Sequence, residues 1–553
     1  MRLSFGSRAL LLLSLTALLA LPVLGCNAGR AGPPGTRRDA GPGGPDGPTV
    51  ACDSPVDSDG DGIADVREGS ADPDGDGVPS SADDDSDGDG IPDATEARST
   101  NPCAPMDSDG DGYFDAIDTD SDNDGVMDRD EVAAGTDPLS RDSDGDGVTD
   151  LGERAAGTNP LDPASTIPAD DFFVVLPYGD PEQNRPLVFG TNIEIADVFF
   201  LIDTTGSMQG AINDVSASMM TIASTVSGVI DDVQFGVGSY EDFPVAPYGE
   251  LFGYGSRFPD RPDWPFHLEQ EITSNLSLVL AALNLTADGG NDWPESGTEA
   301  LYQTATGFGV NYPGGSVPMR TCPEIPDEPA RRRGYPCFRP GALPIIVLVT
   351  DADIHNGPVG ENYSGLPTAA AYAPTVDALN AIGARVIGVD LSSARDDLEP
   401  IARATGTVDG SGTPLVYGPA PASSTSEQII MGITSLVGGT PQDVTTERED
   451  VLGDPPGAEF DATLFITAIV PVEGYGAGGR GTGFSSMDAT TFYDVIPGTD
   501  VEFRVDFINN VYPPPAVATV FQARIIVIGN GVARLDERRV FIVVPPEGGE
   551  ILI

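Results

Sequence analysis

The spacing of hydrophobic residues changes along the chain and divides it into regions of different structural character. A continuous apolar run from Ala9 to Leu24 follows Arg2 and Arg8. It is too short for a comfortable membrane span, and this order of charge and apolar run predicts a secretory signal over residues 1–25. Apolar residues are then sparse as far as about residue 166. With a length of 553 residues, the chain is expected to hold three or four domains.

Residues 193–440 alternate apolar runs of strand length with helical patterns, which predicts an α/β fold. A buried parallel strand is expected at Val198–Ile202, and further strands at Val233–Ser239, Leu268–Thr273, Pro344–Thr350 and Arg385–Val389. Apolar residues from Ile212 to Val229 recur at helix spacing, and further helices are expected at 276–285, 295–306, 372–382 and 425–437. The predicted architecture is a doubly wound, Rossmann-like sheet.

From residue 443 to 553 the pattern changes to β-rich runs separated by turns, which predicts an immunoglobulin-like all-β sandwich. The expected strands are Ala462–Val470, Thr491–Val495, Val501–Ile508, Val520–Val527 and Val540–Val544. Residues 167–192 are either a linker or strands that join this sandwich, because Phe172–Leu176 and Leu187–Phe189 also have strand character. In the second case the α/β domain is an insertion into the sandwich.

The charge of the chain excludes several classes of function. The net charge is -59, and all 28 basic residues are arginines, so P-loop and Schiff-base chemistry are excluded. A chain this acidic repels nucleic acid and anionic lipid headgroups, so its expected partners are cations. Only His267 and His355 carry imidazole, which excludes a multi-histidine zinc site. His355 follows Asp351 by four residues, but without a positioned nucleophile it is not assigned a catalytic role.

The end of the signal segment reads Val23-Leu24-Gly25-Cys26. This resembles the lipobox of bacterial lipoproteins, which implies cleavage before Cys26 and lipidation of that cysteine. The chain would then be an outer-membrane lipoprotein of the bacterial cell envelope, either at the surface or in the periplasm. The alternative is an ordinary cleaved signal with an incidental cysteine. Residues 26–51 are rich in Gly and Pro and are expected to form a tether.

The remaining four cysteines can pair as neighbours in an oxidising compartment, Cys52 with Cys103 and Cys322 with Cys337. Sequence alone does not fix this connectivity.

An acidic motif, DxDxDG, starts six times between Asp57 and Glu153, at intervals of 15, 13, 22, 13 and 22 residues. In the first copy, side-chain oxygens fall at positions 1, 3, 5, 9 and 12, with Gly62 at position 6 and Ile63 at position 7. This is the ligand spacing of a calcium-binding loop. The intervals leave no room for paired helices, so an EF-hand domain is disfavoured.

The candidate calcium ligands, grouped by copy, are Asp57, Asp59, Asp61, Asp65 and Glu68; Asp72, Asp74, Asp76 and Asp83; Asp85, Asp87, Asp89, Asp93 and Glu96; Asp107, Asp109, Asp111, Asp115 and Asp118; Asp120, Asp122, Asp124, Asp128 and Glu131; Asp142, Asp144, Asp146, Asp150 and Glu153. The second copy has Ser80 at position 9. The DSDGDG cores and alternating intervals resemble thrombospondin type 3 (TSP3) repeats, a family in which calcium forms the core of an extended array. The region assigned to it is 52–166, and the alternative is a solvated acidic linker.

The segment Asp203-Thr204-Thr205-Gly206-Ser207 follows the first predicted strand, where an open α/β sheet has its ligand crevice. It resembles the DxSxS signature of von Willebrand factor type A domains, with threonine in place of the first serine. The resemblance implies a metal ion-dependent adhesion site with Asp203, Thr205, Ser207 and Asp351 as ligands. The remaining ligand departs from the family pattern, and Glu295 is the first choice and Asp292 the second. The implied ion is Mg²⁺, or alternatively Mn²⁺ or Ca²⁺.

These patterns predict a lipid-anchored surface protein in which a calcium-stabilised stalk presents a metal-dependent binding domain. The expected partner is an extracellular protein or polysaccharide that offers a carboxylate, and no enzyme activity is expected. Two alternatives stay open: a purely structural calcium-dependent spacer, and a metal-dependent hydrolase that uses the same ion to activate water.

Overall fold

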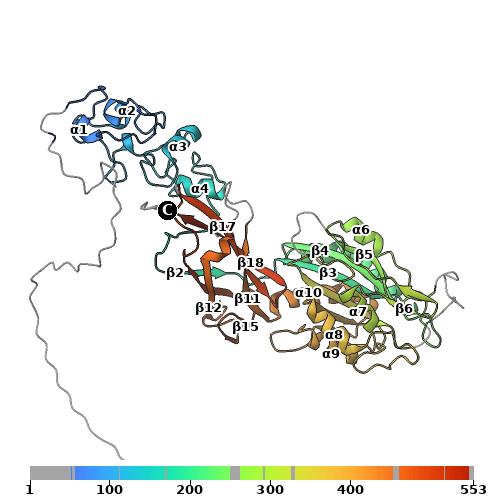
Figure 1. The fold of residues 1–553 in the computed structure, drawn as a ribbon. Helices are drawn as coiled ribbons and strands as arrows, with labels where there is room; N and C mark the ends of the chain where they lie inside the picture. The colour runs from blue at the N-terminus through green and yellow to red at the C-terminus, as the bar shows by residue number, and fades with distance from the viewer. Residues whose placement is uncertain are drawn as a thin grey trace, which may run out of the picture.

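The computed structural model places the acidic array, the β-sandwich and the α/β domain in a row, with the sandwich in the middle (Figure 1). The structure describes residues 52, 56–110, 112–168, 171–249, 262–290, 293–324, 331–451, 460–515 and 517–546. The signal segment 1–25, the tether 26–51 with Cys26, and the candidate ligands Asp111 and Asp292 lie outside these residues. Among the helices that the structure describes, none is both long and apolar enough to cross a membrane.

Each loop of the array ends in a short helical segment that begins at position 9 of its motif. These segments are α1 (Asp65–Glu68), η1 (Ser80–Ala82), α2 (Asp93–Glu96), η2 (Asp115–Ile117), α3 (Asp128–Ala134) and α4 (Asp150–Ala156). The apolar interior that the array supplies for itself is small and includes Ile63, Ala97 and Ala116. The Cys52–Cys103 disulfide joins the start of the array to its middle, with a Cα–Cα distance of 5.8 Å. An array with so little apolar interior needs another source of cohesion.

The α/β domain is built on a six-stranded sheet in the order β10-β9-β8-β3-β4-β5. Its strands are β3 (Ile195–Asp203), β4 (Asp232–Tyr240), β5 (His267–Thr273), β8 (Leu343–Thr350), β9 (Arg385–Asp390) and β10 (Val416–Tyr417). The neighbours from β10 to β4 are parallel, and β5 is antiparallel at the edge. The predicted doubly wound sheet is confirmed.

Helices cover both faces of this sheet, and alternate residues of β3 are therefore buried on opposite sides. The helices are α5 (Gln209–Val226), α6 (Leu276–Ala282), α7 (Gly297–Thr306), α8 (Tyr372–Ala381), α9 (Arg395–Ala404) and α10 (Thr425–Gly439). Val198 and Phe200 pack in one core with residues of α5, α6 and α10, while Phe199 and Leu201 pack in the other with residues of α7, α8 and α9. Parallel strands buried on both faces read as continuous apolar runs, which is why the sequence located them.

The segment between α7 and β8 contains a hairpin of β6 (Val310–Tyr312) and β7 (Gly315–Val317) that the hydrophobic pattern did not predict. The part of this segment that follows the hairpin contains the Cys322–Cys337 disulfide, with a Cα–Cα distance of 5.5 Å. Both predicted disulfides are therefore present.

The C-terminal region forms a sandwich of two sheets, in the orders β1-β18-β17-β11-β15-β14 and β13-β12-β16-β2. The strands are β1 (Phe172–Val175), β2 (Gln183–Phe189), β11 (Gln442–Asp450), β12 (Ile466–Gly476), β13 (Gly479–Arg480), β14 (Ser486–Met487), β15 (Phe492–Val495), β16 (Asp500–Phe507), β17 (Thr519–Gly529) and β18 (Ala533–Val544). Phe492 and Phe503 meet edge to face across the sheets, with ring centroids 5.2 Å apart. The strand predicted to start at Ala462 starts at Ile466 instead, because Ala462–Phe465 forms a 3-10 turn capped by Asp461.

The sandwich encloses the α/β domain in sequence. β1 pairs with β18 and β2 pairs with β16, so the chain builds two sandwich strands before it enters β3. It returns from α10 into β11 through Thr440 and Pro441. The Arg534 amide of β18 donates to the Gly341 carbonyl just before β8 at 2.8 Å, so a hydrogen bond connects the two domains.

Candidate metal sites

The loop after β3 folds back on Asp203, the last residue of that strand. Asp203 is fully buried, and its Oδ1 accepts hydrogen bonds from the Thr205 amide at 2.9 Å and the Thr205 hydroxyl at 2.7 Å. Ser207 follows in a short 3-10 turn, Gly206–Met208, and is exposed at the start of α5. The three predicted ligand positions thus present a buried carboxylate (Asp203), a buried hydroxyl (Thr205) and a solvent-facing hydroxyl (Ser207).

The next parallel strand, β8, supplies two neighbouring groups. Thr350, its last residue, donates its hydroxyl hydrogen to Asp203 Oδ2 at 2.8 Å. Asp351 follows directly, and its Oδ1 is buried without a hydrogen-bond partner among the residues that the structure describes. A carboxylate oxygen in this state is costly unless a cation or proton binds to it. Thr350 was not among the predicted site residues, although its place beside Asp203 on adjacent parallel strands follows from the register of β3 and β8.

Glu295, the first choice for the remaining ligand, is 3% exposed and lies on a backbone bridge to the segment after β8. Its amide donates to the Asp353 carbonyl, and its carbonyl accepts from the His355 amide. A Cβ on Gly290 would lie 3.0 Å from the Thr205 methyl group and 3.1 Å from Glu295 Oε1. The Thr205 and Glu295 side chains therefore both border Gly290, which lets the two loops approach closely at a φ of +76°.

The electrostatics of this corner favour a cation. Burial raises the pKa of Asp203 to about 6, and the charge of Asp351 adds to the rise, while hydrogen bonds from Thr205 and Thr350 oppose it. Burial also raises the pKa of Tyr240, and the charges of Asp203, Glu295 and Asp351 raise it further. The three carboxylates therefore act on one buried phenol. Hard divalent ions prefer oxygen ligands of this kind, so the donor set fits the predicted ion.

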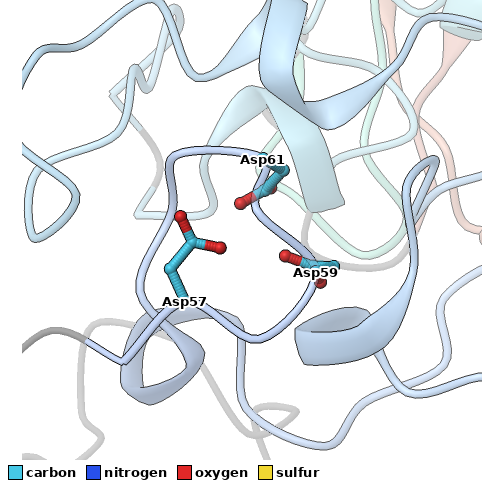
Figure 2. A group of neighbouring side chains, drawn as sticks. All are labelled: Asp57, Asp59 and Asp61. Carbon is cyan, nitrogen blue, oxygen red and sulfur yellow. The ribbon is translucent and has the colours of Figure 1, made fainter.

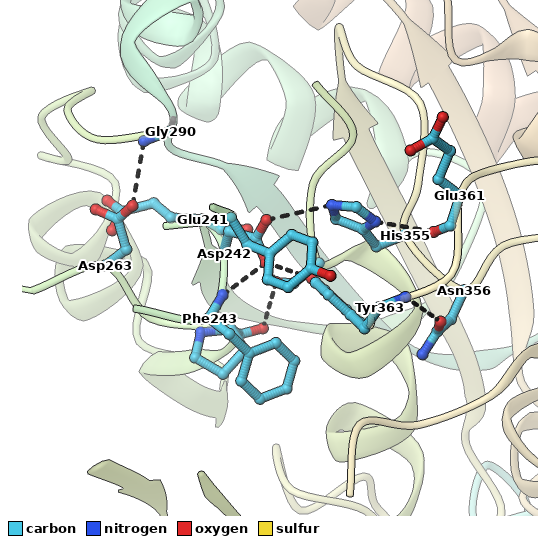
Figure 3. Close-up of polar contacts among 12 residues, drawn as sticks. Glu241, Asp242, Phe243, Asp263, Gly290, His355, Asn356, Glu361 and Tyr363 are labelled. Carbon is cyan, nitrogen blue, oxygen red and sulfur yellow. Dashed lines mark hydrogen bonds and ion pairs between the residues drawn. The ribbon is translucent and has the colours of Figure 1, made fainter. Parts of the chain in front are cut away.

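A second polar network involves Glu241, Asp242, Asp263, Gly290 and His355 (Figure 3). Thr204 donates its hydroxyl hydrogen to Glu241 at 3.2 Å, and the Gly290 amide donates to Asp263 at 3.3 Å. His355 is 1% exposed, with Nδ1 2.8 Å from the Glu361 carbonyl and Nε2 3.6 Å from Asp242. These contacts hold the loops after β4 and β8 together. His355 is therefore buried between these loops and does not face solvent.

The first calcium loop brings Asp57, Asp59 and Asp61 around one point (Figure 2), with one oxygen from each within 4.8 Å of the others. Asp57 accepts hydrogen bonds from the Gly60 amide at 2.6 Å and the Gly62 amide at 3.2 Å, which closes the loop. Both oxygens of Asp59 are buried without a hydrogen-bond partner among the described residues. The same convergence occurs for Asp72, Asp74 and Asp76, and for Asp85, Asp87 and Asp89. Several carboxylate oxygens that converge on one point in this way match a calcium site.

The aspartate at position 9 has a partner that the spacing did not reveal. In the third loop, Asp93 accepts from the Ser86 amide at 2.8 Å and from the Ser86 hydroxyl at 2.7 Å, and Ser86 is position 2 of the same loop. The same serine clamp joins Ser58 to Asp65, Ser108 to Asp115, Ser121 to Asp128 and Ser143 to Asp150. The second loop has Pro73 at position 2 and Ser80 at position 9, so both members of the clamp change together.

The glutamate at position 12 is buried in the loops that end in an α-helical turn. Glu68 and Glu96 are 1% exposed and Glu131 is fully buried, and their carboxylate oxygens lack hydrogen-bond partners among the described residues. Burial raises their pKa values to about 8, about 10 and about 9, and neighbouring aspartates raise them further. Without a cation these groups hold protons near neutral pH.

Acidic groups from repeats two apart in the sequence come together in shared clusters. Oxygens of Asp61 and Glu68 lie within 4.8 Å of an oxygen of Asp93, which belongs to the third loop. Asp89 and Glu96 meet Asp128 of the fifth loop in the same way. Burial raises the pKa of Asp93 to about 6 and that of Asp128 to about 7. The position-9 aspartate therefore joins a serine of its own loop to the acidic group of an earlier loop.

Comparison with protein families identifies part of the array. Residues 85–99, 120–140 and 142–163 match the family described as the bacterial TSP3 repeat. These three segments are therefore similar to bacterial TSP3 repeats. They are the third, fifth and sixth copies, which close with Glu96, Glu131 and Glu153. The first, second and fourth copies are assigned from the same DxDxDG motif. A comparison with curated protein sequences finds no match.

Solved structures with partial similarity include a von Willebrand factor type A protein from Catenulispora acidiphila, at 15% identity and a TM-score of 0.27, over 68% of this chain and 72% of that one. The open conformation of the pilus adhesin SpaC from Lactobacillus rhamnosus GG has 11% identity and a TM-score of 0.27, over 67% and 46%. Proximal thread matrix protein 1 from the mussel byssus has 15% identity and a TM-score of 0.27, over 47% and 50%. The α/β domain has the sheet order β10-β9-β8-β3-β4-β5, and the segment that resembles the von Willebrand factor type A signature begins at the end of β3.

Proposed function

We propose that this chain is a bacterial cell-envelope protein, anchored through lipid on Cys26, that binds an extracellular protein or polysaccharide through a divalent cation at the carboxyl end of β3. Asp203, Thr205, Ser207, Asp351 and Glu295 would hold the cation. The ligand would contribute a carboxylate oxygen.

One observation carries this proposal: the buried, unpartnered Oδ1 of Asp351 lies beside a carboxylate that is already fixed. The Thr205 and Thr350 hydroxyls each donate to Asp203, which holds its carboxylate in one orientation. Ser207 faces solvent at the rim of the same corner. When bound, a divalent ion there supplies positive charge that two hydroxyls and few carboxylates leave incompletely neutralised. The chain's own residues orient the site, and the solvent side is left for the ligand.

Calcium in the repeats serves a different purpose in this proposal. The array has little apolar interior, and the carboxylate oxygens of Glu68, Glu96 and Glu131 lack hydrogen-bond partners among the described residues. Calcium would replace a hydrophobic core there and keep the array extended as a stalk. The binding domain would then stand away from the membrane.

Binding without catalysis is the version that the side chains favour. A hydrolase needs a general base that reaches a metal-bound water, and His355 is 1% exposed and packs against Tyr248 and Tyr363 instead. His267 stacks on Trp264, with ring centroids 4.8 Å apart.

The test is capture of immobilised extracellular proteins and acidic polysaccharides by the purified chain in calcium with added magnesium or manganese. Asp203→Ala is compared with Asp377→Ala, which removes the same charge from an exposed position on α8. Capture by the control and loss of capture by Asp203→Ala would support the proposal. Equal capture by both variants would reject it, and failure of the wild type on every ligand would favour the structural spacer.

A further inference from the structure

The acidic array contacts the sandwich through a small apolar cluster. Val126 and Leu151 of the array pack against Val543 of β18, and Val126 and Leu151 are 5% and 8% exposed. Partly buried Val175, Ala518 and Val520 surround them. The Gln522 side-chain amide also donates to the Ala155 carbonyl at 3.4 Å. We call this cluster the joint.

One carboxylate connects the joint to a calcium loop. Asp124 is fully buried and is position 5 of the fifth DxDxDG motif. Its Oδ1 accepts from the Val126 amide at 2.7 Å, and its Oδ2 accepts from the Leu151 amide at 3.0 Å. These amides belong to the two array residues of the joint. Any change in the position of the Asp124 carboxylate therefore acts directly on both.

The corresponding residues of the first loop do not make such a connection. Asp61 occupies position 5 there, and its Oδ1 accepts from the Ile63 amide at 2.8 Å. Leu151 is position 10 of the sixth loop, and position 10 of the first loop is Val66, which is 39% exposed. The first loop therefore supplies matched controls for both joint residues.

We propose that the joint is a calcium-dependent interface, in which loading of the fifth loop fixes Asp124 and thereby seats Val126 and Leu151 against β18. This inference rests on the proposed binding of calcium by the repeats. With calcium, the stalk and sandwich form one rigid body. Without calcium, the Asp124 carboxylate is free to move, the two apolar residues leave β18, and the stalk swings relative to the binding domain.

The experiment measures the distance distribution between spin labels on cysteines introduced at Val132 of α3 and Leu464 of the sandwich, which are 42% and 52% exposed. The label carrier is the full chain with Cys26→Ser, so that only the introduced thiols react. Leu151→Ser and Asp124→Ala are compared with the matched variants Val66→Ser and Asp61→Ala. Bound calcium is counted in every sample by equilibrium dialysis.

With calcium, we expect a narrow distribution for the wild type and both first-loop variants. The distribution should be at least twice as broad for Leu151→Ser and Asp124→Ala, and for the wild type in chelator. Equal widths for Leu151→Ser and the wild type in calcium, with calcium bound, would overturn the inference and leave the proposed function intact. Absence of bound calcium in the wild type would instead overturn both the inference and the calcium-stiffened stalk.

Discussion

Thr350 shows how a single hydroxyl prepares the candidate metal site. It is fully buried and donates to Asp203 Oδ2, which fixes the carboxylate beside Asp351. Groups that orient a metal ligand typically change metal affinity about 10–100-fold when removed. We expect Thr350→Val to weaken binding of manganese to the calcium-loaded chain by about tenfold, as measured by titration calorimetry.

A matched control separates this effect from a loss of stability. Thr375 is 2% exposed and donates to the Ala371 carbonyl at 2.9 Å on α8. Thr375→Val and Thr350→Val are each expected to cost about 1 kcal/mol of unfolding free energy, but Thr375→Val should leave manganese affinity unchanged. Similar affinity losses in both variants would show that Thr350 acts only through stability.

Glu68 gives the repeats a link to pH. Burial raises its pKa to about 8, so without calcium it is protonated at pH 7 and loses its proton as the pH rises through 8. Calcium binds the ionised form, so loading must release protons, and calcium affinity must fall as the pH is lowered below 8. Titration of calcium into a weakly buffered solution at pH 7 should show this release, and Glu68→Gln should reduce it by about one proton per chain. Glu324→Gln, at an exposed site outside the array, should leave it unchanged.

At the scale of the elements, the glycines at position 4 of the first and third DxDxDG motifs allow the cost of backbone strain to be distinguished from the cost of a steric clash between loops. Gly60 and Gly88 both have positive φ, +91° and +73°. A Cβ on Gly60 has nothing within 4 Å, whereas one on Gly88 would lie 2.7 Å from the Asp74 Cβ of the preceding loop. Gly60→Ala should cost about 1 kcal/mol of unfolding free energy, and Gly88→Ala should cost about 1–3 kcal/mol more. Calcium-loaded thermal unfolding measures both, and equal losses would contradict the packing of the second loop on the third.

How far the sequence predicted these elements depended on burial. β3 and β8 are buried on both faces, so their apolar runs located the strands and also Asp203 and Asp351 at their ends. β11 was missed because only its first residues are well buried, and polar side chains such as Thr446 and Glu447 dilute its pattern. The serine clamp was not predicted because the spacing of carboxylates identifies candidate metal ligands but not the donors that hold them, although Pro73 and Ser80 differ together from the other copies in the sequence.

On the scale of the whole molecule, the net charge of -59 opposes compaction of the array unless cations balance it. Because every basic residue is an arginine, trypsin can cut the array only at Arg67, Arg98, Arg129, Arg141 and Arg154. We expect these sites to resist trypsin in calcium and to be cleaved first in chelator, while the sandwich and α/β domain persist. Restored resistance on adding excess calcium is the control. An array equally resistant in both conditions would show that calcium is not its core.

The central claim is that Asp203 and Asp351 help to hold a divalent ion that still has room for a ligand. Anomalous diffraction from a crystal of the calcium-loaded chain soaked in manganese tests it most directly. We expect a peak beside these two carboxylates, in contact with the Thr205 and Ser207 hydroxyls and with a coordination position open to solvent. The absence of a peak there, or an ion enclosed on every side by the chain's own side chains, would contradict the account.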